Sequence, residues 1–148
     1  MVSAGGKLSE RCFHTANLMH DGKSIMVYGG WNNKVMFSDV CILDTEKREW
    51  LEVEAASQLA KYNHSSLIID AIPHLRFSFF GGSELEFNES EKREYGKYSN
   101  NVLLYTVENE SWSDVLLDDT KDGVPERRNS SAIMFDIKKR RMVVYGGY

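Results

Sequence analysis

The chain has 148 residues, of which 42% are hydrophobic and 27% charged, a composition typical of a globular protein rather than a disordered segment. Its net charge of −4 is too small to indicate attraction to nucleic acid or to an anionic membrane. No stretch approaches the ~20 apolar residues of a membrane span, the first residues lack the apolar core of a secretory signal, and two cysteines are too few for a disulfide scaffold. We therefore expect a protein of the cytoplasm, or alternatively the nucleus, that binds neither nucleic acid nor membrane.

Short strands separated by turn residues are predicted from residue 15 onward. The first four are expected at 15–19, 25–28, 40–44 and 50–53, and the next four at 66–69, 77–80, 102–106 and 112–115. Asp21-Gly22 suits a tight hairpin because glycine readily adopts a positive φ, and the polar run at 44–47 suits a second turn. Helical periodicity is weak throughout, so the pattern predicts an all-β chain of four-stranded units.

A pair of glycines closes the second strand of each unit. The pair occurs three times, as Gly29-Gly30, Gly81-Gly82 and Gly146-Gly147. Glycine at the end of a strand permits backbone torsions or close approaches that any Cβ would block. Three copies of this feature indicate three repeated units.

Two further segments recur around the glycine pairs. The upstream segment begins with a basic residue and lies at 11–16, 61–66 and 127–132. Downstream, a short polar residue precedes a tryptophan by 11 residues, Asp39 before Trp50 and Asn101 before Trp112. The polar side chain can bond nearby backbone amides, and the tryptophan offers a large surface that can fill the space between neighbouring sheets.

The glycine pair, the downstream tryptophan and the upstream Arg-x-x-His-Thr-Ala together resemble the Kelch repeat family over about residues 11–148. The resemblance implies an all-β, Kelch-type β-propeller fragment of four-stranded antiparallel blades, with two full blades plus part of a third. The expected parts are an N-terminal extension (1–10), a first blade (11–60), a second blade (61–126) with an inserted loop (83–97), and a partial third blade (127–148). Propellers close with four to eight blades, so we expect a fragment, or a chain whose partners supply the remaining blades.

Residues that carry chemistry are few. His14 and His64 share one repeat position, which favours structural hydrogen bonding over metal ligation, and the third repeat is aligned with Ser130 at that position. Cys12 and Cys41 do not form the closely spaced cluster that zinc requires. Phosphate-binding loops, nucleophile elbows and zinc-protease motifs are absent from the sequence. We therefore predict no catalytic residue, no metal site and no cofactor.

The resemblance also implies a function and a surface for it. Kelch proteins commonly bind partners through the loops that follow the glycine pair and the loops that join successive blades, so we expect a protein–protein interaction module, a scaffold or substrate adaptor for a protein or peptide. The candidate partner-binding residues are Arg11, Trp31, Asn32, Asn33, Lys61, Tyr62, Asn63, Glu84, Arg127, Arg128 and Asn129. The alternative is an accessory Kelch segment of a larger enzyme (a phosphatase, ubiquitin-ligase complex or methyltransferase) whose catalytic part lies outside these residues. Cytoskeletal binding is a third hypothesis.

The basic residues of these loops leave two roles open. Arg11, Lys61 and Arg127 are aligned at one position of the repeat. They would either ring a shared site for an acidic peptide or bond the backbone and acidic side chains of the blades. The sequence alone favours neither role.

Overall fold

The computed structural model describes residues 2–53, 59–71, 74–88, 90–118 and 120–148, and the regular structure in these ranges is β-strand. The strands in chain order are β1 (Val2–Gly6), β2 (Thr15–Leu18), β3 (Ser24–Tyr28), β4 (Val40–Asp44), β5 (Glu49–Val53), β6 (Ser65–Ala71), β7 (His74–Phe80), β8 (Ser83–Asn88), β9 (Arg93–Tyr98), β10 (Val102–Thr106), β11 (Ser111–Val115), β12 (Ala132–Asp136) and β13 (Arg141–Tyr145). The predicted strands are present as β2 to β7, β10 and β11, which confirms the all-β class. No helix in the described ranges is long and apolar enough to cross a membrane.

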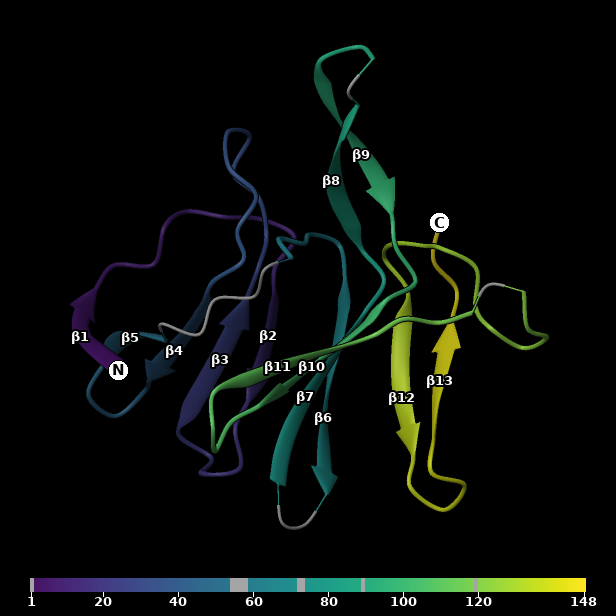
Figure 1. Ribbon diagram of the computed structural model, residues 1–148. Coiled ribbons are helices and arrows are strands. Elements are labelled where there is room, and N and C mark those ends of the chain that lie inside the picture. The colour runs from purple at the N-terminus through teal and green to yellow at the C-terminus, as the bar shows by residue number, and fades with distance from the viewer. Residues whose placement is uncertain (1, 54–58, 72–73, 89, 119) are drawn as a thin grey trace.

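The strands form successive antiparallel sheets that lie side by side (Figure 1). The first has the order β1-β5-β4-β3-β2, the second has the order β11-β10-β7-β6, and β12 pairs with β13 to begin a third. Strand β6 contacts both β2 and β12. The strands that follow the three upstream segments, β2, β6 and β12, therefore lie innermost. This arrangement confirms the prediction of two full blades and part of a third.

The N-terminal residues add a strand that the sequence analysis did not predict. Strand β1 pairs antiparallel with β5 and makes the first sheet five-stranded, with Val2 opposite Val53 and Ala4 opposite Leu51. Its sequence, Val-Ser-Ala-Gly-Gly, has little strand propensity. It becomes a strand because β5 offers an open edge of backbone hydrogen-bonding groups.

The insertion at 83–97, expected as a loop, is a β-hairpin. Strands β8 and β9 pair from Ser83 opposite Tyr98 to Asn88 opposite Arg93. Polar and apolar residues alternate along Ser-Glu-Leu-Glu-Phe-Asn. This period of two is typical of a strand, and the prediction of a loop did not take it into account. The hairpin projects beyond the blades at the top of Figure 1.

An aromatic core joins the first two blades. Tyr28, Phe79 and Tyr105 are at most 2% exposed, and the ring of Trp112 lies 5.0 Å from that of Tyr28 and 4.9 Å from that of Tyr105. Burying each such side chain contributes about 1.5–3 kcal/mol. Trp112 thus fills the space between two sheets, as predicted, whereas Trp50 is only partly buried and lines a small hollow on the other face of the first blade.

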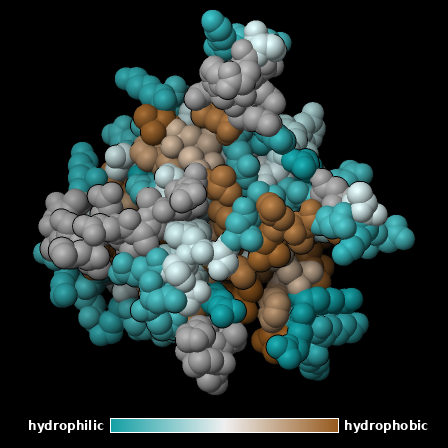
Figure 2. Space-filling view, viewed as in Figure 1, coloured by the Kyte–Doolittle hydropathy of each residue, from teal (hydrophilic) through white to brown (hydrophobic). Residues whose placement is uncertain are grey.

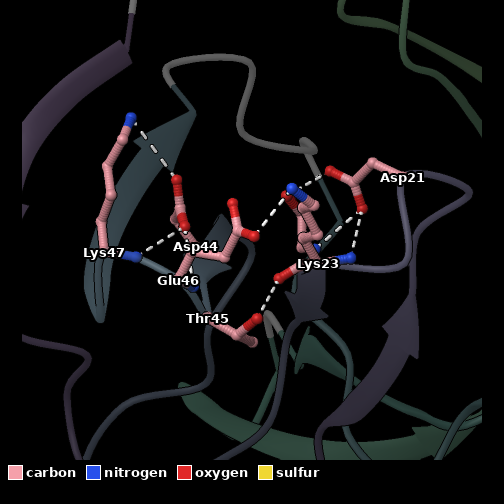
Figure 3. A network of polar contacts seen from close by, with 7 residues as sticks. Asp21, Lys23, Asp44, Thr45, Glu46 and Lys47 are labelled. Carbon is pink, nitrogen blue, oxygen red and sulfur yellow. Dashed lines mark hydrogen bonds and ion pairs between the residues drawn. The ribbon is translucent and has the colours of Figure 1, made fainter.

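Short polar turns close the opposite end of the first blade (Figure 3). Asp21 accepts hydrogen bonds from the backbone amides of Lys23 and Ser24, and Asp44 does the same for the amides of Glu46 and Lys47. The hydroxyl of Ser24 also donates to Asp21, and this bond, followed by the two amide bonds, lowers the pKa of that carboxyl group. The amide bonds to Asp44, first that of Lys47, lower the pKa of Asp44. An exposed ion pair of 2.7 Å between Lys23 and Glu46 links the two turns. This end, which we call the turn end, consists of locally satisfied polar groups.

Candidate functional site

The glycine pairs and the upstream segments lie at the other end of the blades, which we call the glycine rim. It comprises the inter-blade segments (11–14, 61–64 and 127–131) and the segments that follow the glycine pairs (29–39, 81–101 and 146–148). The rim is at the top of Figure 1, the end from which the hairpin and the C-terminus project. The candidate partner-binding residues lie within these segments, so the fold brings them to one end of the molecule.

The first two glycine pairs form the joints between one blade and the next. The amide of Gly30 donates to the carbonyl of Lys61 (2.8 Å), and the amide of Gly82 donates to the carbonyl of Arg128 (3.0 Å). Gly29 has a φ of +66°, and a Cβ built on it would lie 2.5 Å from the carbonyl oxygen of Lys61. Only glycine therefore permits this close approach of two backbones.

A second line of backbone bonds crosses the blades nearer to the axis. Phe13, Asn63 and Ser130 share the left-handed conformation, with φ of 60°, 54° and 52°. The amide of Asn63 donates to the carbonyl of Phe13 (3.0 Å), and the amide of Ser130 donates to the carbonyl of Asn63 (2.8 Å). Each blade thus bonds to the preceding one through an equivalent residue.

This geometry corrects the alignment of the third repeat. A basic side chain donates to the carbonyl of the first glycine in every repeat: Arg11 to Gly29 (3.1 Å), Lys61 to Gly81 (3.1 Å) and Arg128 to Gly146 (3.1 Å). Placing Arg127 at the position of Arg11 was therefore wrong by one residue, and Ser131, not Ser130, stands where the other repeats have histidine. Two consecutive arginines and two consecutive serines made both registers look acceptable in the sequence.

In the first blade the basic residue is paired within the blade. The guanidinium of Arg11 donates to both carboxylate oxygens of Asp39 (2.6 and 2.9 Å), and lies 3.8 Å from the centre of the Phe37 ring. Its side chain is 2% exposed. Burial of Asp39 opposes ionisation, but the hydrogen bonds and charge of Arg11 outweigh it and lower the pKa of Asp39. The guanidinium of Arg11 thus bonds groups of its own blade.

In the second blade the counter-ion comes from the inserted hairpin. The side chain of Lys61 is fully buried, and its amine donates to Ser99 (3.1 Å) and to Glu84, the second residue of β8. Burial lowers the pKa of Lys61, and the adjacent carboxylate of Glu84 opposes that shift. Of the two roles that the sequence left open for Arg11 and Lys61, the bonds observed are those to backbone and acidic groups of the blades.

Aromatic side chains cover the rim between the first two blades. The ring of Tyr62 stacks with Trp31 at 5.9 Å and lies 6.2 Å from Phe13, which is 51% exposed. Reciprocal backbone bonds of 2.8 and 2.9 Å between Cys12 and Trp31 fix the loops that carry these rings. Phe13 was not among the predicted residues. The signal for it was an aromatic residue two positions after Arg11 in an inter-blade segment.

The remaining predicted residues mainly shape the loops. Asn32 accepts hydrogen bonds from the amides of Lys34 and Val35 and so closes a turn, and Asn33 has a φ of 69°. Asn129 donates to the hydroxyl of Ser83 (3.4 Å) and so links the third blade to the base of the hairpin. Arg127 is exposed and borders a hollow with residues 124–126.

Small polar side chains line the inner face of the blades. Thr15, His64 and Ser131 border an open hollow of about 380 Å³, and the hydroxyl of Thr15 lies 2.8 Å from Nε2 of His64. Burial, with the nearby charge of Lys61, lowers the pKa of His64 to about 3, so the imidazole is neutral at neutral pH. Its role here is to bond and pack between blades.

Radially adjoining antiparallel blades, joined at glycine pairs and packed through a shared aromatic core, define the class of the protein as a segment of a β-propeller. Within the part of the chain that the structure describes, no group of three or more His, Cys, Asp or Glu residues could hold a metal ion.

The chain belongs to the Kelch repeat family, because the family model of the KLHDC2/KLHL20/DRC7 Kelch-repeats domain matches residues 1–148. A comparison with curated proteins found no match. Kelch-repeats domains are in general protein-interaction modules and typically are not catalytic.

Proposed function

We propose that this chain acts as a scaffold or substrate adaptor that binds a protein or peptide partner on the glycine rim. The observation that carries the proposal is the cluster of Phe13, Trp31 and Tyr62, three aromatic side chains gathered at the joint between two blades. Exposed large aromatic residues on a rigid support are characteristic anchors of protein interfaces.

The arrangement of the charged groups supports the same surface. Arg11 and Lys61 are buried against acidic partners, so their charges stabilise the blades and are not presented to a ligand. Of the aromatic residues beside them, Phe13 is 51% exposed, whereas Trp31 and Tyr62 are partly buried. The loops that carry them are fixed by backbone bonds to the neighbouring segments. A preformed surface of this kind binds without the cost of ordering its loops.

The test compares a rim variant with a turn-end variant of the same chain. Partners captured from cells are quantified side by side for the wild type, for Trp31→Ala/Tyr62→Ala and for Lys23→Ala/Glu46→Ala. Loss of an interface anchor costs at least about 2 kcal/mol, so a true partner is recovered at least about tenfold less with the rim variant. Full recovery with the rim variant, together with loss in the turn-end variant, would place the interface at the opposite end and refute the proposal.

A further inference from the structure

A groove lies on the rim beside the aromatic cluster, between the segment that follows the first glycine pair and the inserted hairpin. Its volume is about 390 Å³, within the range of roughly 300–1,000 Å³ typical of ligand pockets. The residues that line it are Lys34, Val35, Met36, Leu59, Ala60, Glu84 and Leu85. Figure 2 shows hydrophobic atoms gathered below the projecting hairpin, on the side of this segment.

The walls of the groove present apolar side chains to solvent. Val35 is 51% exposed and Leu85 is 50% exposed, although both are large aliphatic residues that usually lie inside a protein. They stand on opposite walls, one on the segment after Gly30 and the other on β8. Leu59 and Ala60, which are partly buried, also line the groove. A single apolar side chain entering between the walls would cover both exposed residues.

The charged groups at the groove are unequal. Glu84 is neutralised by its ion pair with the buried amine of Lys61, whereas Lys34 is exposed on the opposite wall. The charge left at the mouth of the groove is therefore positive. The same Lys61–Glu84 pair fixes the start of β8, so the wall that carries Leu85 is held in place.

One wall also offers backbone groups. Strand β8 pairs with β9 along one edge, and among the described residues the two strands form a sheet of their own. The bridge between Tyr62 and Ser83 touches only the first residue of β8. An extended peptide can add to such an edge by backbone hydrogen bonds while alternate side chains enter the adjoining pocket.

We propose that this groove binds an extended peptide segment in which a large apolar side chain enters between Val35 and Leu85 and a neighbouring acidic residue pairs with Lys34. The inference deepens the proposed function, on which it rests, by naming the partner class and the part of the rim that selects it. Charge complementarity at Lys34 sets the acidic position, and the exposed aliphatic pair sets the apolar one.

The experiment uses a phage-displayed library of random peptides selected on the full chain. Selected peptides are expected to share an apolar residue followed or preceded closely by an acidic one. Leu85→Glu should weaken the binding of these peptides at least about tenfold, and Lys34→Glu should weaken it about tenfold. A peptide whose acidic residue is replaced by lysine should regain affinity for the Lys34→Glu variant. Both substituted side chains are exposed, and an unchanged thermal unfolding midpoint verifies that the variants fold.

The outcomes separate this inference from the proposal it rests on. Peptides that bind the wild type and Leu85→Glu equally, but are lost with Trp31→Ala/Tyr62→Ala, overturn the groove and leave the rim as the interface. Peptides that respond to neither variant overturn both. The inference is also overturned if no selected peptide prefers the wild type over Leu85→Glu. It is overturned as well if the wild type self-associates and Leu85→Glu abolishes this, because the occupant of the groove is then a second copy of the chain.

Discussion

The first two blades solve one structural requirement in different ways. Each places a basic side chain against the carbonyl of its first glycine, but Arg11 is neutralised by Asp39 at the start of β4, whereas Lys61 is neutralised by Glu84 on the inserted hairpin. The position of Asp39 is taken by the uncharged Asn101 in the second blade. The comparison teaches that the insertion belongs to the second blade's structure, because it supplies the counter-ion that the blade itself lacks.

The largest expected effect tests the joint that both blades share. In Gly81→Ala, the new Cβ would collide with the carbonyl oxygen of Arg128 at a residue whose φ is +67°. We expect the free energy of unfolding to fall by about 3–5 kcal/mol, the range of the most damaging substitutions, as measured by urea denaturation.

Gly146→Ala is the matched control for that substitution. Gly146 has the same φ of +67°, but nothing lies within 4 Å of the position of its Cβ. The free energy of unfolding of this variant should fall by only about 1–2 kcal/mol, which is the cost of a left-handed conformation for a residue with a Cβ. If both variants lose the same free energy of unfolding, the close approach between blades is not the reason that glycine is required at position 81.

An intermediate effect tests where the counter-ion comes from. Glu84→Ala leaves the buried amine of Lys61 without its acidic partner and should destabilise the fold by about 2 kcal/mol in urea denaturation, less than the full value for a buried pair because Glu84 is partly exposed. Adding Asn101→Asp should restore part of this loss, since it recreates the arrangement of the first blade. Asn101→Asp alone, with Glu84 present, is the control. If the double variant is no more stable than Glu84→Ala, the two acidic positions are not interchangeable.

The smallest effect concerns pH and the two equivalent histidines. Burial depresses the pKa of His64 to about 3, below its unfolded value of about 6.5, so the unfolded chain binds a proton first as the pH falls. Stability is therefore present above about pH 6.5 and is lost progressively towards pH 3. At pH 5.5 the loss from this group is about 1.4 kcal/mol.

Two variants assign this pH dependence. His64→Phe keeps the ring that packs against Tyr28 and Phe79 but has no proton to bind, so its stability should change less between pH 7 and 5.5. His14→Phe alters the exposed histidine at the equivalent position and leaves His64 with burial, the main cause of its lowered pKa, so most of the loss assigned to His64 should remain. Measurements above pH 4.5 avoid the contribution of Asp39, because the stability from a carboxyl group with a lowered pKa is lost only as the pH falls below its unfolded pKa of about 3.9.

The fold was largely predictable because strand alternation, glycine pairs and the tryptophan spacing are local signals. The same local character explains the errors. Arg127 and Arg128 are chemically identical neighbours, and their roles are set by a backbone bond from the amide of Gly82, which lies far away in the sequence, to the carbonyl of Arg128. The spacing held a hint, since Ser131 precedes Gly146 by 15 residues, as His14 precedes Gly29.

The candidate site was predictable in its location but not in its details. The repeat placed Trp31 and Tyr62 on loops of the same rim, and the structure brings their rings together. The pairing of Lys61 with Glu84 depends on how an insertion folds back over its blade, which no pattern within the repeat encodes. Arg11 and Phe13 are close in sequence, but the side chain of Arg11 is buried and Phe13 is exposed. This difference in exposure arises only from tertiary packing.

The joints at the glycine pairs are made by amide and carbonyl groups, which every residue type except proline supplies in full. Evolution can consequently exchange the side chains of Trp31, Tyr62 or Leu85 without loosening the attachment of one blade to the next. A scaffold whose joints at the rim are made by main-chain bonds is free to diversify the side chains of that rim, and new specificities can arise on it by single substitutions.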